Sequence, residues 1–349
     1  MLWFIWSLGC INQVFQKDFQ CEELESSSII ISENYILTPH EQVVEKIERL
    51  GIVREKAPLP GYLYRPDDDR SHPSILLLHG LEGGNGDFRY EKGKKPTQTG
   101  ENAWVPVLAR YLASQGYVTY ALCYFDCGHH LEFENHPPDE LIGIDLKEHF
   151  LPAMRALRSA PYSKGEKMAF WGTSRGGELA LVLGSILSKH GQSLGVGLPH
   201  LVLAHSPPDY IASGFSKKTA AAIIAGKTPE WDLKPAWMLD HFVPAMGDVI
   251  PIEDYEGPIL VTYGAKDEVW PPSVKPTNLQ RRYTEKKKSA GFLSYQNKND
   301  RKEAFMNLCD GQQKRMFVEY ADEGHYLTPK SESDYLNNAL TIAFLKKYL

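Results

Sequence analysis

Apolar runs that alternate with helical segments dominate the chain from residue 74 onward. The first run, at 74–78, ends in His-Gly, and an uninterrupted apolar run is typical of a strand buried on both faces of a parallel sheet. Later strands are predicted at 117–122, 167–171, 200–204, 259–263 and 315–320, with helices at 104–115, 141–159 and 176–189. Strands separated by helices indicate βαβ units. We therefore predict an α/β fold with a mostly parallel central sheet and helices on both faces.

The pattern changes near residue 51 and divides the chain into two parts. Residues 51–349 are the predicted α/β domain, which begins with a hairpin of strands at 51–54 and 61–64. Residues 1–50 are a predicted N-terminal extension with a helix at 39–50. The extension begins with the uncharged stretch MLWFIWSLGC, which is similar to the apolar core of a secretory signal, with a faint lipoprotein cleavage site at Leu8-Gly9-Cys10.

The amino-terminal stretch gives only partial information about the cellular location of the protein. No Lys or Arg precedes the apolar residues, so the signal is incomplete and a cytoplasmic location is favoured. The alternative is export, or a lipid anchor within residues 1–10, and any membrane association is expected only through this segment. No apolar run of the chain is long enough to cross a bilayer.

Composition and charge narrow the functional classes. The 349 residues include 38 Lys and Arg against 44 Asp and Glu, which gives a net charge of −6. The chain therefore lacks the excess of positive charge that is typical of proteins that bind nucleic acid. Five cysteines are few and odd in number, so a disulfide scaffold is not indicated. Cys127, His129, His130 and His136 cluster in one stretch, but their spacing fits no zinc pattern, and we predict neither a metal nor a cofactor.

The strongest chemical signal is a G-x-S-x-G turn between a predicted strand and a predicted helix. Gly172-Thr-Ser174-Arg-Gly176 follows the strand at 167–171 and precedes the helix at 176–189. A sharp strand-to-helix turn forces the serine into a strained conformation that exposes its hydroxyl. The flanking glycines are expected because a Cβ there would clash with the neighbouring strand and helix. Ser174 is therefore the predicted nucleophile.

A serine nucleophile needs a general base and a carboxylate that orients the base. In this fold class the chain order is serine, acid, histidine. Asp267 follows the strand at 259–263 and is the predicted acid, with the adjacent Glu268 as an alternative. His325 follows the strand at 315–320 and is the predicted base, whereas His205 precedes the acid and breaks the expected order.

Stabilisation of an oxyanion requires two hydrogen-bond donors. One is predicted to be the backbone N–H of Arg175, the residue after the nucleophile. The other is expected from the loop that follows the strand at 74–78, where Leu81 is the predicted donor.

Several sequence segments, beyond the G-x-S-x-G turn itself, resemble those of one family. Gly172-Thr-Ser-Arg-Gly-Gly-Glu-Leu resembles the nucleophile segment of the acyl-CoA thioester hydrolase / bile acid-CoA:amino acid N-acyltransferase C-terminal domain, a family of α/β-hydrolases. Asp267-Glu-Val-Trp-Pro is similar to its acid segment and Glu323-Gly-His325 to its histidine segment. The resemblance extends over roughly residues 73–349. It implies Ser174, Asp267 and His325 as a catalytic triad, in agreement with the reading of the residues.

The family resemblance also implies a substrate class, namely a small-molecule acyl thioester or ester. Members with amino-acid transferase activity typically use a cysteine nucleophile, so a serine favours water as the acceptor and hence hydrolysis. Animal members also carry an N-terminal β-sandwich domain, and the roughly 50–70 residues that precede the hydrolase core here are too few to form it. Other esters therefore stay open as substrates. Acyl transfer from CoA to an amine and a non-catalytic binding protein with the same fold are the alternatives.

Two segments bear on the substrate. Residues 213–249 contain apolar patches and are a candidate lid or acyl pocket, with packing on the core as the alternative. Residues 275–315 are rich in Lys and Arg, which can attract the phosphates of coenzyme A or form a solvated surface.

Overall fold

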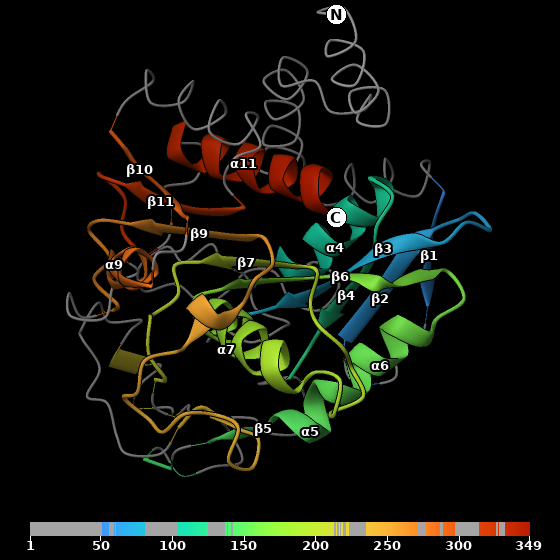
Figure 1. Cartoon of the computed structure of the whole chain (residues 1–349). Coiled ribbons are helices and arrows are strands. Elements are labelled where there is room, and N and C mark those ends of the chain that lie inside the picture. The colour runs from blue at the N-terminus through green and yellow to red at the C-terminus, as the bar shows by residue number, and fades with distance from the viewer. Residues whose placement is uncertain are drawn as a thin grey trace, which may run out of the picture.

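A twisted sheet with helices on both faces forms the centre of the protein (Figure 1). The structure is a computed structural model that describes residues 51–55, 59, 61–80, 104–124, 137, 139–140, 142–212, 214, 216, 218, 221–222, 235–270, 277–286, 289–296, 314–325, 327 and 332–349. The N-terminal extension with its predicted helix at 39–50, Leu81 and the cluster from Cys127 to His136 lie outside these residues. Within the described part, no helix combines the length and the apolar character needed to span a membrane.

Nine of the described strands form one large sheet in the order β1-β2-β4-β3-β6-β7-β9-β11-β10. The strands are β1 (Ile52–Glu55), β2 (Gly61–Pro66), β3 (His72–Leu78), β4 (Val118–Leu122), β6 (Ser163–Thr173), β7 (Leu201–His205), β9 (Ile259–Gly264), β10 (Gly291–Tyr295) and β11 (Arg315–Tyr320). The β1–β2 and β2–β4 pairs are antiparallel, and all other pairs in this sheet are parallel. The predicted hairpin and the mostly parallel sheet are thereby confirmed.

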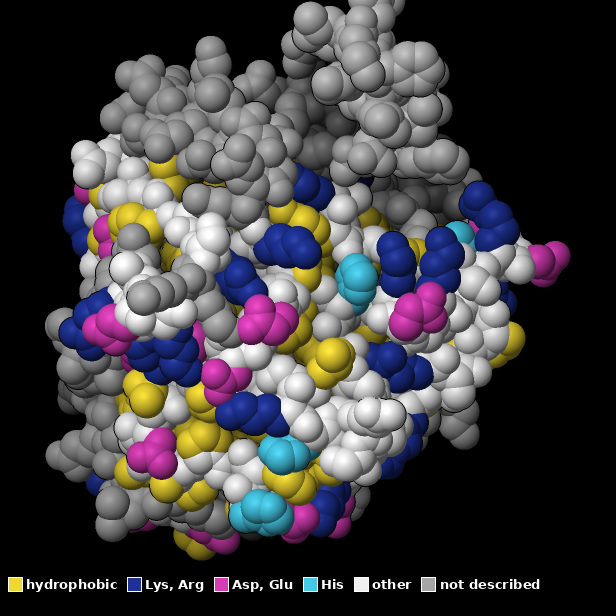
Figure 2. Space-filling view, in the orientation of Figure 1, with side chains coloured by type: hydrophobic (Ala, Val, Ile, Leu, Met, Phe, Trp, Pro, Cys, Tyr) yellow, Lys and Arg dark blue, Asp and Glu magenta, His cyan; other side chains and the backbone are white. Residues whose placement is uncertain are grey.

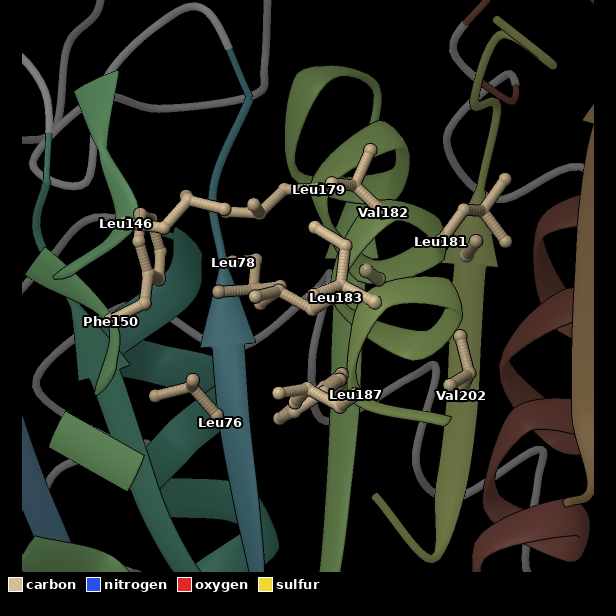
Figure 3. Close-up of a cluster of buried hydrophobic side chains, with 14 of the residues drawn as sticks. Leu76, Leu78, Leu146, Phe150, Leu179, Leu181, Val182, Leu183, Leu187 and Val202 are labelled. Carbon is tan, nitrogen blue, oxygen red and sulfur yellow. The ribbon is translucent and has the colours of Figure 1, made fainter. Parts of the chain in front are cut away.

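Two buried clusters cover the two faces of the sheet. The described helices are α4 (Trp104–Ser114), α5 (Leu146–His149), α6 (Leu151–Ser159), α7 (Arg175–His190), α9 (Thr277–Glu285) and α11 (Glu332–Tyr348). The helices α4 and α11 bury apolar side chains on one face, and α5, α6, α7 and α9 do so on the other. On the second face, Leu183 and Leu187 of α7 lie over Leu76 and Leu78 of β3 (Figure 3). Burial of such side chains contributes about 2 kcal/mol each, so α7 is anchored firmly beneath the serine at its start.

The single helix predicted over residues 141–159 is wrong. The chain instead forms the short strand β5 (Ile144–Asp145), then α5, then α6. Pro152 lies in the first turn of α6, where a missing N–H costs nothing, but a proline further inside a helix would clash with the preceding turn. The strand β5 pairs with β8 (Trp237–Met238), a partner more than ninety residues later that local periodicity does not reveal.

Part of the candidate lid packs on the core. Trp237 is fully buried, and its ring contacts the rings of Phe150 and Tyr124 edge-on. Ala236 and Leu239 belong to the same buried cluster. The described end of the segment is thus fixed to the sheet, while most of residues 213–234 lie outside the described part, and a lid there stays a prediction.

One covalent link was not indicated by the cysteine count. Cys123 follows β4 directly and takes part in a disulfide bond. The odd number of cysteines therefore does not mean that all of them are reduced.

Candidate active site

Ser174 occupies a strained turn between β6 and α7. Its φ of 54° and ψ of −117° place a residue with a Cβ in an unfavourable region of backbone conformation. A Cβ on Gly172 would lie 1.9 Å from the carbonyl oxygen of Gly176, and one on Gly176 would lie 2.1 Å from that of Leu78 in β3. The turn can therefore close only with glycine at both flanks, as the sequence indicated.

Three side chains from distant parts of the sequence meet at the carboxyl ends of the strands. The Nε2 atom of His325 lies 2.8 Å from Oγ of Ser174, and its Nδ1 atom lies 2.8 Å from Oδ2 of Asp267. All three residues are buried. Because a carboxylate only accepts hydrogen bonds, the imidazole donates through Nδ1, and in its neutral form it therefore presents an unprotonated Nε2 to the serine hydroxyl. This geometry permits the transfer of the hydroxyl proton to His325.

The carboxyl group of Asp267 is held in its ionised form. Burial by itself raises its pKa, but the charge and hydrogen bond of His325 outweigh burial and lower the pKa. The backbone N–H groups of Trp270 and Val269 donate to Oδ1 at 3.1 and 2.9 Å and act in the same direction. The turn after β9 thus keeps Oδ2 directed at the imidazole.

The two alternatives considered for the acid and the base have other contacts. The Oε2 atom of Glu268 accepts a hydrogen bond from the backbone N–H of His325 at 3.4 Å, and Asp267 is the carboxylate that contacts the imidazole. Nδ1 of His205 lies 2.6 Å from the hydroxyl of Thr262 on the neighbouring strand β9. The His205 backbone carbonyl, in contrast, accepts the N–H of Ser174 at 2.7 Å.

Of the two predicted oxyanion donors, Arg175 lies among the described residues and Leu81 does not. Arg175 is the first residue of α7, and the first amides of a helix have no acceptor within the helix. The helix dipole adds positive potential at the same place, which suits a developing oxyanion beside Ser174. Leu81 lies outside the described residues, so the second donor stays a prediction.

Sequence reasoning missed a buried network behind the nucleophile. The Arg175 guanidinium forms an ion pair with Glu178 at 3.1 Å and lies over the ring of Trp270, 5.5 Å from its centroid. The second carboxylate oxygen of Glu178 accepts the backbone N–H of Ala212 at 2.8 Å. The strings Gly-Gly-Glu and Asp-x-x-Trp-Pro, which carried the family resemblance, contain Glu178 and Trp270 and were the available signal.

A second buried group supports the start of the predicted oxyanion loop. The imidazole of His79 stacks on the ring of Tyr124, with centroids 3.8 Å apart, and is completely buried. Its Nδ1 donates to the carbonyl of Gly80 at 2.8 Å, and its Nε2 accepts the N–H of Tyr124 at 3.3 Å. The Tyr124 hydroxyl also donates to the carbonyl of His79. Burial lowers the pKa of His79 to about 3, so the ring is neutral at physiological pH.

The neutral state of His79 predicts a pH-dependent stability. An unfolded histidine binds its proton near pH 6.5, whereas folded His79 does so only near pH 3. Between these values the unfolded chain binds more protons, so the free energy of unfolding should fall as the pH falls, by about 1 kcal/mol per pH unit. His205, with its pKa lowered to about 4 by burial, acts in the same direction.

Denaturant titrations of the protein between pH 7 and pH 4.5 measure this slope. His79→Gln should reduce the slope of the unfolding free energy with pH by roughly the contribution of one proton. His241→Gln is the matched control, because His241 is exposed. Equal slopes for His79→Gln and the unmodified protein would contradict the prediction.

The described part of the basic segment is largely paired with acidic groups. Arg282 of α9 and Lys286, which directly follows α9, lie within 3.5 and 3.1 Å of Glu253 carboxylate oxygens, and Lys286 also contacts Asp254 at 3.0 Å. Acidic and basic side chains lie intermixed on the face shown in Figure 2. These described residues therefore form no separate field of positive charge for phosphate groups.

The strand order, the parallel sheet and a serine in the sharp turn between β6 and α7 define the class of the α/β-hydrolases. Residues 144–299 match the model of the family described as BAAT / Acyl-CoA thioester hydrolase C terminal. The resemblance to this family that was drawn from the sequence is confirmed over these residues.

The chain is also similar to individual known proteins. The chain is 26% identical to acyl-coenzyme A thioesterase 6 of Mus musculus over 212 residues, which cover 61% of this chain and 44% of that protein. Among solved structures, an esterase from Thermogutta terrifontis is similar over 81% of this chain and 84% of its own, with 14% identity and a TM-score of 0.41. An acylaminoacyl peptidase from Pyrococcus horikoshii is similar over 85% of this chain and 40% of its own, with 13% identity and a TM-score of 0.42.

Proposed function

We propose that this protein is a serine hydrolase that cleaves an acyl thioester of the acyl-CoA type, or a carboxylic ester, through an acyl-serine intermediate. The observation that carries the proposal is the position of His325, which lies 2.8 Å from both the Ser174 hydroxyl and the Asp267 carboxylate. Side chains that only bind a ligand do not need this order of nucleophile, base and acid. The thioesterase named among the relatives and the family description support the thioester as substrate.

The first half of the reaction acylates the enzyme. Nε2 of His325 takes the hydroxyl proton as Oγ of Ser174 attacks the carbonyl carbon, and the carbonyl oxygen becomes an oxyanion beside the N–H of Arg175. Collapse of this intermediate breaks the bond to the thiol or alcohol, which leaves with the proton from His325. Asp267 stabilises the imidazolium while it exists and keeps its proton-bearing Nδ1 in place.

The second half releases the acid. Water loses a proton to His325 and attacks the acyl-serine carbonyl, and the ester bond to Ser174 breaks as the proton returns to Oγ. The products are a carboxylic acid and the regenerated serine. An amine in place of water would give an amide instead, so the product formed in the presence of glycine or taurine separates hydrolysis from acyl transfer.

Covalent labelling by a fluorophosphonate tests the nucleophile without knowledge of the substrate. Attack by Ser174 forms a P–O bond and expels fluoride, and His325 accepts the hydroxyl proton. We expect one label per chain, located at Ser174 by peptide mass spectrometry. In His325→Gln, labelling should be slower by about 10²- to 10⁴-fold, because the general base is lost.

The outcomes of the labelling experiment are distinct. His241→Gln serves as the control for a histidine substitution remote from these contacts. A folded protein that takes up no label would favour a non-catalytic binding protein, and a label on another serine would overturn the assignment of Ser174. The ratio of kcat/KM for an acyl-CoA to that for an aryl ester then decides between thioester and ester substrates.

A further inference from the structure

Ser206 is a buried residue in an unusual conformation next to the candidate site. It follows β7 directly and is 0% exposed, with a φ of 46°. A residue with a Cβ rarely adopts this left-handed conformation, which is unfavourable for the isolated chain. Surrounding contacts must therefore hold Ser206 in place, and such strained positions cluster at functional sites.

Each polar group of Ser206 bonds to a different segment of the site. Its N–H donates to the carbonyl of Thr262 in β9 at 2.7 Å, and its carbonyl accepts the indole N–H of Trp270 at 2.9 Å. Its hydroxyl donates to the backbone carbonyl of His325 at 2.7 Å. The carbonyl of the preceding residue, His205, accepts the N–H of Ser174. Residues 205–206 thus connect the segments that carry all three members of the proposed triad.

The backbone of His325 is held from both sides. Ser206 bonds to its carbonyl, and Glu268 accepts its N–H at 3.4 Å. The Trp270 ring, which Ser206 fixes through the indole N–H, meets the imidazole edge-on with centroids 5.9 Å apart. His325 lies in the loop after β11, next to Gly324, where strand pairing no longer restricts the backbone. Bonds to its backbone therefore determine where Nε2 points.

We propose that Ser206 is a positioning residue that orients His325 toward Ser174 through the backbone carbonyl of His325. The inference rests on the proposed function, because it concerns the same base and nucleophile. Ser206 contacts no reacting atom, and its hydroxyl acts only through His325. Loss of the hydroxyl releases the backbone carbonyl of His325 and lets Nε2 drift from the hydroxyl of Ser174, and small displacements of this kind reduce rates strongly.

Ser206→Ala is the direct test, because it removes one hydroxyl and keeps the Cβ. We expect kcat and the rate of fluorophosphonate labelling to fall together by about 10- to 100-fold, with KM changed less than about twofold. The downfield proton NMR signal of the His325 Nδ1–H should broaden as this hydrogen bond to Asp267 loosens. Ser74→Ala is the matched control: Ser74 is equally buried and also forms a hydroxyl hydrogen bond, to Ser163 at 2.6 Å, at the amino end of β3.

Ser206→Gly separates positioning from general stability. Glycine adopts a φ of 46° without strain, so this variant should melt at or above the temperature of Ser206→Ala. Its labelling rate should nevertheless stay as low as that of Ser206→Ala, since the hydroxyl is absent in both. A purely structural role would instead make the rate follow the melting temperature.

The result that would overturn this inference differs from the result that would overturn the proposed function. If the unmodified protein labels at Ser174 and folded Ser206→Ala labels at the same rate, Ser206 does not position the base. A rate that rises with melting temperature in Ser206→Gly would also reject it. If the unmodified protein takes up no label at all, the proposed function itself fails.

Discussion

Ser174→Ala is expected to lower kcat by about 10⁵- to 10⁶-fold, which corresponds to roughly 7–8 kcal/mol of transition-state stabilisation. The substitution removes the only atom of the residue that can form the proposed acyl intermediate, and His325, the proposed base, then has no hydroxyl to deprotonate. Binding should persist, because the backbone and the surrounding side chains are unchanged. Turnover of an acyl-CoA or aryl ester, measured with KM, checks the prediction.

Substitutions of Ser174 are expected to leave the stability of the protein unchanged or to raise it, although they abolish activity. Alanine keeps the strained φ of 54°, so the melting temperature of Ser174→Ala should stay close to that of the unmodified protein. Glycine relieves the strain, and Ser174→Gly should be more stable by about 1 kcal/mol while equally inactive. Ser185→Ala, a buried serine further along α7, is the control. Turnover of Ser174→Ala within tenfold of the unmodified rate would refute the nucleophile.

Glu178→Ala is expected to produce the largest loss of stability, about 3–5 kcal/mol. Glu178 is 0% exposed and is the ion-pair partner of Arg175, which is 1% exposed. Removal of the carboxylate leaves a buried guanidinium without its counter-charge and deprives the N–H of Ala212 of its acceptor. Urea denaturation at pH 7 measures the effect.

Companion variants identify which part of the Glu178 side chain is responsible. Glu178→Gln keeps an oxygen acceptor for Ala212 and should cost less than Glu178→Ala. The double variant Arg175→Met with Glu178→Leu removes both charges and should recover most of the loss, because an apolar pair carries no desolvation penalty. Burial raises the pKa of Glu178 despite the nearby Arg175, which agrees with a costly buried charge. A loss below about 1 kcal/mol in Glu178→Ala would contradict this account.

The elements that define the fold could be predicted because local patterns encode them. The apolar runs of β3, β9 and β11 are long enough to distinguish buried strands from their surroundings, and the glycines around Ser174 mark the turn. Among the elements that were missed, two strands depend on distant partners. The edge strand β10 gains its hydrogen bonds from β11, and β5 pairs only with β8. A short strand has no pattern of its own strong enough to be recognised without its neighbour.

The candidate site also combines features that could be predicted from the sequence with features that could not. Ser174, Asp267 and His325 each follow a predicted strand, so their placement at one edge of the sheet could be expected from the chain alone. The choice between Asp267 and Glu268 could not, because adjacent carboxylates point in different directions only once the turn after β9 is folded.

The sequence by itself determined the buried strands of the parallel sheet, the serine turn and the three residue types proposed for catalysis, since hydrophobic periodicity and glycine placement are local properties. Only the tertiary structure decided which groups hold these three residues in their relative positions. His325 contacts residues 58 and 151 positions away, and Ser206 contacts His325 across 119. Hydrogen bonds over such separations depend on how the whole sheet is assembled, and no local pattern records them.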